Sequence, residues 1–449
     1  MAIRDFIILG FLVVSLPLCF IRPFYGVILW TIFAFLNPHR YAYGARDLPV
    51  AMAIAIATLV GVLLFTRDWR PFFSKGMVWF LVLWLWFTLT TIISVNTPLF
   101  IPHSADTWLR WREVSKMLLM TFVALGVVNN WSRFRWFILA ICGSFGVLVV
   151  KLLPMMIFTG GAARIYGPDN TMIADNNDLG LALNMTLPMF FFLAKTEENR
   201  RMRILMWFLF LATIPAIFFT YSRGAFVGLV VISGLMIFRS KRSLMLLPVA
   251  GLVVLFALVL APQAWRDRMG TVIGGNLDGS ALGRINAWKF AISLSSEFPI
   301  TGGGFESFTP ELFRRYAPNP GDVHGPHSIY FGILGEHGWI GLILYALFIT
   351  ACFVRLHRVI RSAKLTGDQQ IENYARMLQF SLIAFLVSGS FLGRAYFDYF
   401  FMIVACTVVL ARLWDIDRAR WMDSAELDEI SPQEEMQADT EAETAMSEV

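Results

Sequence analysis

Two arginines of this sequence stand where a phosphate group could be bound. Arg223 lies in TYSRGAF, a short turn between two long apolar stretches. Its guanidinium matches the geometry of a phosphate, but an arginine in such a turn can also snorkel to lipid headgroups, so both interpretations stay open. Arg284 lies in SALGRINAWKFAI, which has the pattern of an amphipathic helix. There the periodicity alone favours a solvated helix face that carries Arg284 and Lys289.

A candidate general base lies in the segment VHGPHSIYFGILGEHGWIG, residues 323–341, which holds three of the six histidines of the chain. Pro326 disfavours a helix before it, so His327 should lie near a helix N-terminus. Imidazole titrates near neutral pH and suits proton transfer. We expect His327 to be the base, through its expected partners Arg223 and Arg284. We expect His324 to be its neighbour in the loop and His337 to be a hydrogen-bonded packing residue.

A metal site is a competing interpretation of the same segment, because Asp322, His324 and His327 have the spacing D-x-H-x-x-H, which is possible for zinc. A loop with Pro and Gly is a poor rigid scaffold, however, and we expect no metal. The sequence also contains no Walker-type glycine loop and no GxSxG elbow. The cysteines predict small core residues rather than a disulfide framework, because all four lie within apolar runs: Cys19, Cys142, Cys352 and Cys406.

Transmembrane helices must position these residues. Of the residues of the chain, 57% are hydrophobic and only 15% are charged, whereas in soluble proteins about a quarter of the residues are charged. The first 36 residues form one long tilted span or two short ones broken at Arg22-Pro23. The sequence thus predicts an all-α polytopic membrane protein of twelve or thirteen helices, with twelve preferred. Further spans are expected at 48–66, 76–96, 116–129, 135–158, 178–194, 203–219, 223–238, 243–261, 328–353, 377–392 and 397–412.

The basic residues predict the orientation of these helices, because their clusters fall on alternate connections and can all be cytoplasmic. The longest connection on the other side, residues 262–327, should then be a structured external loop with amphipathic helices. After Arg420 the chain has ten acidic and no basic residues, which is typical of a disordered tail. The predicted organisation is therefore N-terminal transmembrane helices over 1–261, the loop over 262–327, C-terminal transmembrane helices over 328–415 and an acidic cytoplasmic tail over 416–449.

Three segments, TYSRGAF, GRINAWKFAI and HSIYFGILGEHGWIG, resemble those of the bacterial O-antigen ligase family, and the similarity covers about residues 1–415. More specifically, RPFYGVILWTIFAFLNPHRYAYG, RIYGPDNTMIADNNDLGLALNMTLP and TGGGFESFTPELFRRYAPNP look like the exosortase-associated subgroup of O-glycosylation ligases. The resemblance implies a membrane glycosyltransferase of the GT-C type that is metal-independent and inverting. It would transfer an O-antigen type glycan from undecaprenyl pyrophosphate to a hydroxyl of a lipid A-core sugar or of a protein Ser or Thr. The reaction would take place at the periplasmic face of the bacterial inner membrane.

The resemblance also implies roles for particular residues. Arg223 and Arg284 match arginines that hold the pyrophosphate of the donor, and His327 matches the histidine that would take the proton of the acceptor hydroxyl. The bond energy comes from the activated donor, so no ATP or other cofactor is expected, and no nucleic acid partner. Further possible substrate-binding residues are Lys116, Arg110, Arg112, Asp175, Asn176 and His324.

Three alternatives to a ligase remain. A glycan polymerase uses the same donor and differs only in its acceptor. A secondary transporter would place ionisable groups near the bilayer midplane, often in repeated halves, whereas here they gather at one face and no repeat is visible. A lipid-binding scaffold without catalysis would direct Arg223 and His327 outward to lipid.

Overall fold

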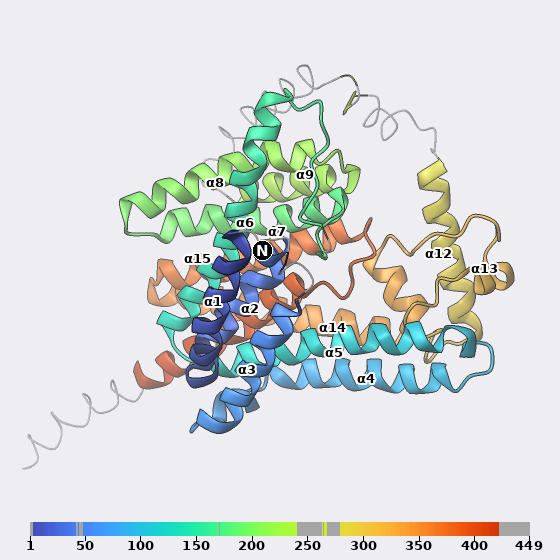
Figure 1. Cartoon of the computed structure of the whole chain (residues 1–449), viewed down its shortest axis with the longest axis horizontal. Helices are drawn as coiled ribbons and strands as arrows, with labels where there is room; N and C mark the ends of the chain where they lie inside the picture. The colour runs from blue at the N-terminus through green and yellow to red at the C-terminus, as the bar shows by residue number, and fades with distance from the viewer. Residues whose placement is uncertain are drawn as a thin grey trace, which may run out of the picture.

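The computed structural model describes residues 3–41, 44, 48–169, 171–239, 263, 265–266 and 279–421, and the regular secondary structure of these residues is entirely helical. The chain begins with helices α1 (Ile3–Ile21), α2 (Pro23–Leu36) and α3 (Val50–Phe65), which pack on one another (Figure 1). Arg22 separates α1 from α2, with Pro23 at the first helical position. The first 36 residues therefore form two helices, because proline lacks the N–H that a continuous helix would need.

Ten further α-helices are described between α3 and the last helix, and three short 3₁₀ turns lie along the chain. Helix α6 has Asn130 as its N-cap, α7 has Asp175 and α8 has Asn199, so the three start at residues whose side chains accept backbone N–H groups. The bounds are η1 Pro38–Tyr41, η2 Arg70–Phe73, α4 Met77–Val95, η3 Ile101–His103, α5 Ser104–Val127, α6 Trp131–Phe158, α7 Asn176–Thr196, α8 Arg200–Phe219, α9 Arg223–Phe238, α12 Gly279–Glu297, α13 Pro310–Tyr316, α14 Ile329–Thr366, α15 Gln369–Gly389 and a last described helix Asp398–Trp421.

Seven of the described helices are long and apolar enough to cross a membrane, which supports a multi-pass membrane protein. They are α1, α4, α6, α7, α8, α14 and Asp398–Trp421, and α2, α3 and α9 are shorter apolar helices. The predicted span 243–261 is not among the residues described. The expected total of about twelve transmembrane helices therefore stays a prediction.

Helix α7 is the centre of the bundle, because nearly all of its side chains are buried against α8, α9 and α15. Asn184 of α7 is fully buried and donates hydrogen bonds to Ala225 O (2.8 Å) and Ser388 Oγ (3.3 Å). One side chain thus joins three helices, and its buried amide N–H groups find acceptors that no water in the interior would supply. All four cysteines are buried and free, which confirms their expected packing role.

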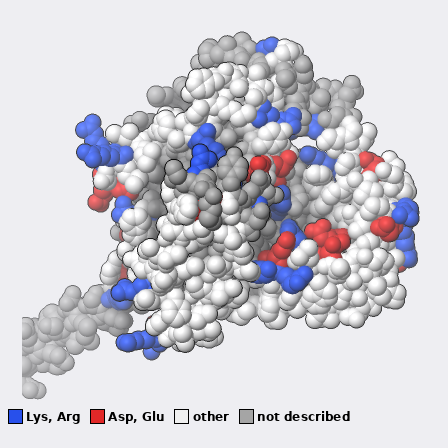
Figure 2. All heavy atoms as spheres, in the orientation of Figure 1, with Lys and Arg blue, Asp and Glu red and all other residues white. Residues whose placement is uncertain are grey.

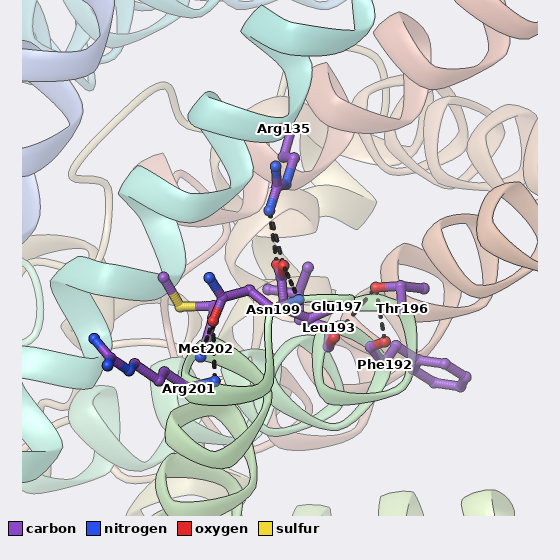
Figure 3. Close-up of polar contacts among 8 residues, drawn as sticks. All are labelled: Arg135, Phe192, Leu193, Thr196, Glu197, Asn199, Arg201 and Met202. Carbon is purple, nitrogen blue, oxygen red and sulfur yellow. Dashed lines mark hydrogen bonds and ion pairs between the residues drawn. The ribbon is translucent and has the colours of Figure 1, made fainter.

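The turn between α7 and α8 is held by a pair of opposite charges (Figure 3). Arg135 of α6 donates from Nη2 to both carboxylate oxygens of Glu197, each at 2.9 Å. Asn199 then caps α8, and its Oδ1 accepts from the backbone N–H groups of Arg201 and Met202. The Arg201 side chain points away from the other residues drawn.

Helix α4 marks two opposite ends of the molecule. At its start, a Cβ placed on Gly76 would lie 2.5 Å from Arg355 Nη1. At its other end, Ser94 donates to Gly303 O at 2.7 Å, close to where α12 and α13 cap the bundle (Figure 1). Nineteen helical residues extend about 28 Å, close to the thickness of a hydrocarbon core. The arginines near 355–361 and the loop helices therefore lie on opposite sides of one membrane-length helix.

Two predicted boundaries are wrong. Helix α14 runs 38 residues, from Ile329 to Thr366, instead of ending near 353, and it is kinked at Gly338, whose φ is +68°. The last helix continues to Trp421, although we predicted a disordered tail from 416. A contact that depends on the fold extends it, since Asp417 accepts from Trp131 Nε1 at 2.6 Å. The rest of that tail, 422–449, is beyond the described part of the chain.

The kink of α14 generates the first prediction. Gly338→Ala would place a Cβ 2.6 Å from Ile300 O. It would also force alanine into a backbone conformation, φ +68° and ψ −173°, that is essentially restricted to glycine, which costs about 1–3 kcal/mol before any clash. We expect a clear fall of the melting temperature in detergent. The matched control is Gly143→Ala in α6, where a Cβ meets nothing within 4 Å. Equal melting temperatures for the two variants would contradict the required kink.

Candidate functional site

Charged side chains of both signs surround a hollow on one face of the molecule. In Figure 2 this hollow lies between the part formed by α8 and α9 and the part formed by α4 and α5, which are located from Figure 1. The segments predicted to carry function border it from several elements. They are the turn before α9, the N-terminus of α7, the first turns of α12 and the loop that leads into α14.

Arg223 is the first residue of α9, directly after the N-cap Ser222. Two asparagines of α7 fix this turn, because Asn176 donates to Thr220 O (2.7 Å) and Asn184 to Ala225 O (2.8 Å). The half-buried Arg223 reaches α12, where Nη2 contacts Ser280 Oγ at 3.4 Å. Its side chain is therefore directed to the next protein element, as the inward interpretation requires.

Arg284 lies one helical turn beyond Ser280 on α12, so Arg223 and Arg284 are brought to the same end of that helix. Lys289 is exposed, whereas Arg284 is half-buried. The predicted solvated face therefore fits Lys289 better than Arg284. The buried face of α12 contains Asn286, Ala287 and Phe290, while the apolar side chains of Leu282 and Ile292 are exposed.

His327 directly precedes Ser328, the N-cap of α14, in agreement with the expected helix start. Its φ of +40° is unusual for a residue other than glycine. Two residues of α12 hold the loop in front of it. Asn286 donates to Asn319 O (2.8 Å) and Asp322 O (2.9 Å), and Trp288 Nε1 donates to Pro326 O (2.9 Å).

The environment of His327 keeps its imidazole neutral. Burial lowers the pKa of His327 below its usual value, and the positive charges of Arg284 and His324 lower it further, while Asp175 acts in the opposite direction. The charges of Arg284, His324 and Asp175 thus all act on this imidazole. A neutral imidazole is the form that can accept a proton.

His324 is bound to its own loop. Its Nε2 contacts Asp322 Oδ1 at 2.7 Å, and its ring centroid is 6.4 Å from that of His327. A Cβ on Gly283 would lie 2.4 Å from the His324 ring, so this ring packs on α12 beside Arg284. Among the residues that the structure describes, no group of three His, Cys, Asp or Glu side chains is placed to hold a metal ion. The D-x-H-x-x-H spacing therefore does not become a metal-binding geometry there.

The two candidates in the segment before α7 have different surroundings. Asp175 is exposed and caps α7, and its Oδ1 accepts from Asn177 N at 2.8 Å. Asn176 is buried, and its amide is used to hold the Arg223 turn. Asn176 is thus a positioning residue in this geometry, whereas the Asp175 carboxylate acts on His327 through its charge.

The sequence reasoning missed a buried ion pair at this site. Arg394, in the turn before the last helix, is paired with Asp178 of α7. Asp178, together with Asp175, raises the pKa of Arg394 although burial opposes this. The signal was available, since Arg394 lies in a connection predicted to be outside, where arginines are rare.

The three basic candidates on α5 have different surroundings. Arg110 is half-buried and contacts Glu113 (2.9 Å) and Glu306 (3.6 Å), with its guanidinium carbon 5.9 Å from the centre of the Tyr396 ring. Arg112 and Lys116 are exposed. Arg110 therefore belongs to a second polar cluster, in which Tyr396 donates to the buried Glu336 at 2.6 Å and Glu306 N donates to the same carboxylate at 3.1 Å.

His337 is a packing residue, as predicted. It is fully buried, its Nδ1 is hydrogen-bonded to Thr90 Oγ1 (2.7 Å), and its ring stacks on Phe87 at 4.4 Å. It follows Glu336 at the kink of α14, on the far side of the site from the loop histidines. Nothing in the sequence pattern indicated that Glu336 and Tyr396 would pair, because the two residues are 60 positions apart.

The arrangement combines two guanidinium groups with one neutral imidazole. Arginines bind phosphate oxygens through two parallel hydrogen bonds and keep their charge in a protein. A diphosphate could therefore be held beside the first turns of α12, with His327 ready to take a proton from a hydroxyl.

Comparison with protein families divides the chain into two parts. Residues 207–346 match the sequence model of a family described as O-Antigen ligase. Residues 3–198 match a family of unknown function. No curated protein matches the chain. The first match contains Arg223, Arg284 and His327, and it confirms the expected resemblance to O-antigen ligases over that part of the chain.

The hydrogen bonds of Asn286 generate a second prediction. Asn286→Leu keeps the size of the side chain but removes its bonds to the loop, each worth about 1 kcal/mol. We expect amide hydrogen exchange over residues 317–327 to accelerate by about tenfold or more. Ser296→Ala, on an exposed position of the same helix, is the control and should leave that exchange unchanged. Unchanged exchange in Asn286→Leu would show that the loop is held by other contacts.

Proposed function

We propose that this chain, with an O-antigen ligase domain over residues 207–346, transfers a glycan from a polyprenyl pyrophosphate carrier to an acceptor hydroxyl. The observation that carries the proposal is the gathering of three distant segments around the first turns of α12. Arg223 contacts Ser280, one turn before Arg284. The loop of His327 is held on the same helix by Trp288 and by the packing of His324 on Gly283. A multi-pass protein with this site near the end of its helices suits a donor whose lipid tail stays in the bilayer.

In the proposed reaction, the acceptor oxygen attacks C1 of the donor sugar as the bond from C1 to the pyrophosphate oxygen breaks. Negative charge then builds on the polyprenyl pyrophosphate that leaves. Arg223 and Arg284 stabilise this charge more strongly in the transition state than in the bound donor, which is the condition for catalysis. The hydroxyl proton goes to His327. Because the acceptor oxygen attacks C1 on the face opposite the leaving pyrophosphate, the configuration at C1 is inverted.

The positioning residues explain why this geometry survives at a membrane surface. Asn176 and Asn184 hold the turn of Arg223, while Asn286 and Trp288 hold the loop of His327. Catalytic groups on loops need such support, because a displacement of about 1 Å can cost about 10²-fold in rate. We place the site at the periplasmic face of the inner membrane, opposite the basic residues near Arg355, since these fit the cytoplasmic side.

A polymerase would differ from the proposed ligase only in its acceptor. In both reactions the donor would bind to the same two arginines. A lipid A-core sugar, a protein Ser or Thr, and a second lipid-linked glycan are therefore the acceptors to be compared with purified protein. A transporter would move the intact donor without consuming it, so release of free polyprenyl pyrophosphate separates transfer from transport.

The role of His327 is tested by His327→Asn, which suits the left-handed backbone but cannot act as a base. We expect kcat to fall by about 10²–10⁴-fold, with donor binding retained. The control is His357→Ala, an exposed histidine of α14 far along the helix. Transfer by His327→Asn at the wild-type rate would refute His327 as the base.

The pH dependence gives a further test. Because the folded pKa of His327 is below its ordinary 6.5, wild-type kcat/KM should stay constant down to that value and fall only below it, as the imidazole becomes protonated. Arg284→Gln removes a charge that disfavours the imidazolium. The acidic limb of the kcat/KM profile of this variant, normalised to its plateau, should then lie at higher pH than that of the wild type. A limb that stays in place or moves lower would show that Arg284 does not act on His327.

A further inference from the structure

The end of the molecule opposite the candidate site contains a basic cavity of about 790 Å³, formed where the start of α4 meets the ends of α14 and the last helix. We call it the basal cavity. Its volume is in the range of ordinary ligand sites. The charged side chains that line it are Lys75, Arg355, Arg358, Arg361, Arg412, Arg418 and Asp415. Six cations with one carboxylate require an anion nearby, or they would repel one another.

Two buried polar atoms of the basal cavity lack a hydrogen-bond partner. Trp414 lines the cavity and is only 2% exposed, and its Nε1 has no acceptor. Ser74, also in the lining, has a buried Oγ without a partner. An indole N–H can only donate, so a ligand that completes this site must supply an acceptor oxygen. Arg412 is already used, since it donates to Pro71 O and Val128 O at 2.7 Å each.

The lining also contains apolar side chains that are open to the surroundings. Leu365 is 83% exposed and Ile416 is 42% exposed. The cavity opens beside Met77, where the apolar span α4 begins, so it lies at the level of lipid headgroups. A ligand with an anionic head and an apolar body fits this combination better than free phosphate does.

We propose that the basal cavity binds the phosphodiester headgroup of an anionic phospholipid, with the acyl chains lying along Leu365 and Ile416. The phosphate oxygens accept from Trp414 and from the guanidinium groups of Arg355, Arg358 and Arg361. Basic pockets between helices on the cytoplasmic side are known to suit such headgroups. The site is independent of the glycan transfer proposed above and lies at the other end of the bundle.

The test uses the full-length chain in detergent, with phosphatidylglycerol titrated and bound lipid counted by native mass spectrometry. Arg358→Gln with Arg361→Gln removes two exposed cations of the cavity, and we expect binding about tenfold or more weaker. The matched control is Arg200→Gln with Arg201→Gln, which removes the same charge from the start of α8, outside the cavity. Its affinity should stay within about twofold of wild type. Equal losses in the two double variants would mean general charge attraction and would overturn the site.

A second variant keeps the test valid if the arginine changes disturb folding. Trp414→Phe retains an aromatic ring but removes the donor, and we expect about tenfold weaker binding of phosphatidylglycerol. Unchanged binding in this variant would refute the assigned contact with Trp414 and with it the proposed headgroup position.

Titrations with two further ligands distinguish a lipid headgroup from free phosphate as the bound anion. Zwitterionic phosphatidylethanolamine and inorganic phosphate should each bind about tenfold or more weakly than phosphatidylglycerol. Inorganic phosphate that displaces the lipid at equal concentration would overturn the lipid assignment. A second result would also overturn the lipid assignment. In it, the wild-type chain binds neither phosphatidylglycerol nor inorganic phosphate, while a variant whose ten acidic residues after Arg420 are replaced by neutral amides binds both. In that case the chain's own acidic tail would be the occupant.

Discussion

The site depends on hydrogen bonds that two side chains of α12 make to a loop without regular structure. Backbone carbonyls near a bilayer must find donors within the protein, because the hydrocarbon offers none. Asn286 and Trp288 supply donors to the carbonyls of Asn319, Asp322 and Pro326. The same helix carries Arg284, so the element that orders the histidine loop also presents the cation that faces it. Gly393 completes this arrangement, since a Cβ there would lie 3.4 Å from His327 N.

The second polar cluster has a related function in the fold. Glu336 accepts from Tyr396 and from Glu306 N, while Gly303 and Gly304 donate to the carbonyls of Gly335 and Glu336. These bonds join the glycine-rich segment to α14 at its kink. The carboxylate is buried, and its bonding partners compensate for the loss of water. The beginning of α14, and so the position of Ser328 and His327, is thereby fixed from both sides.

The sequence was sufficient for the features that follow from local pattern. The helix around Arg284, the turn at Arg223 and the helix start after His327 all depend on neighbours within a few residues, and each is found where it was predicted. The faces of the helix around Arg284 differ from the prediction, because Leu282 and Ile292 are exposed while Arg284 is half-buried. The pairs Asp178–Arg394 and Glu336–Tyr396 join segments 216 and 60 residues apart. Such contacts depend on how helices pack, which local pattern does not contain. The added turns of α14 and of the last helix also needed tertiary contacts to be settled.

Helix α9 has a consequence for the membrane itself. Its 16 residues extend only about 24 Å, less than a hydrocarbon core of about 30 Å. The arginines that flank it, Arg223 and Arg239, have partners in the protein, since Arg223 contacts Ser280 and Arg239 donates to Gln379 at 2.9 Å. Neither end can therefore move far to relieve the mismatch, and the lipid must compress instead, at a cost of a fraction of a kcal/mol per Å. Thinning of this kind at the Arg223 end of α9 would shorten the distance that a lipid-anchored headgroup travels to the candidate site.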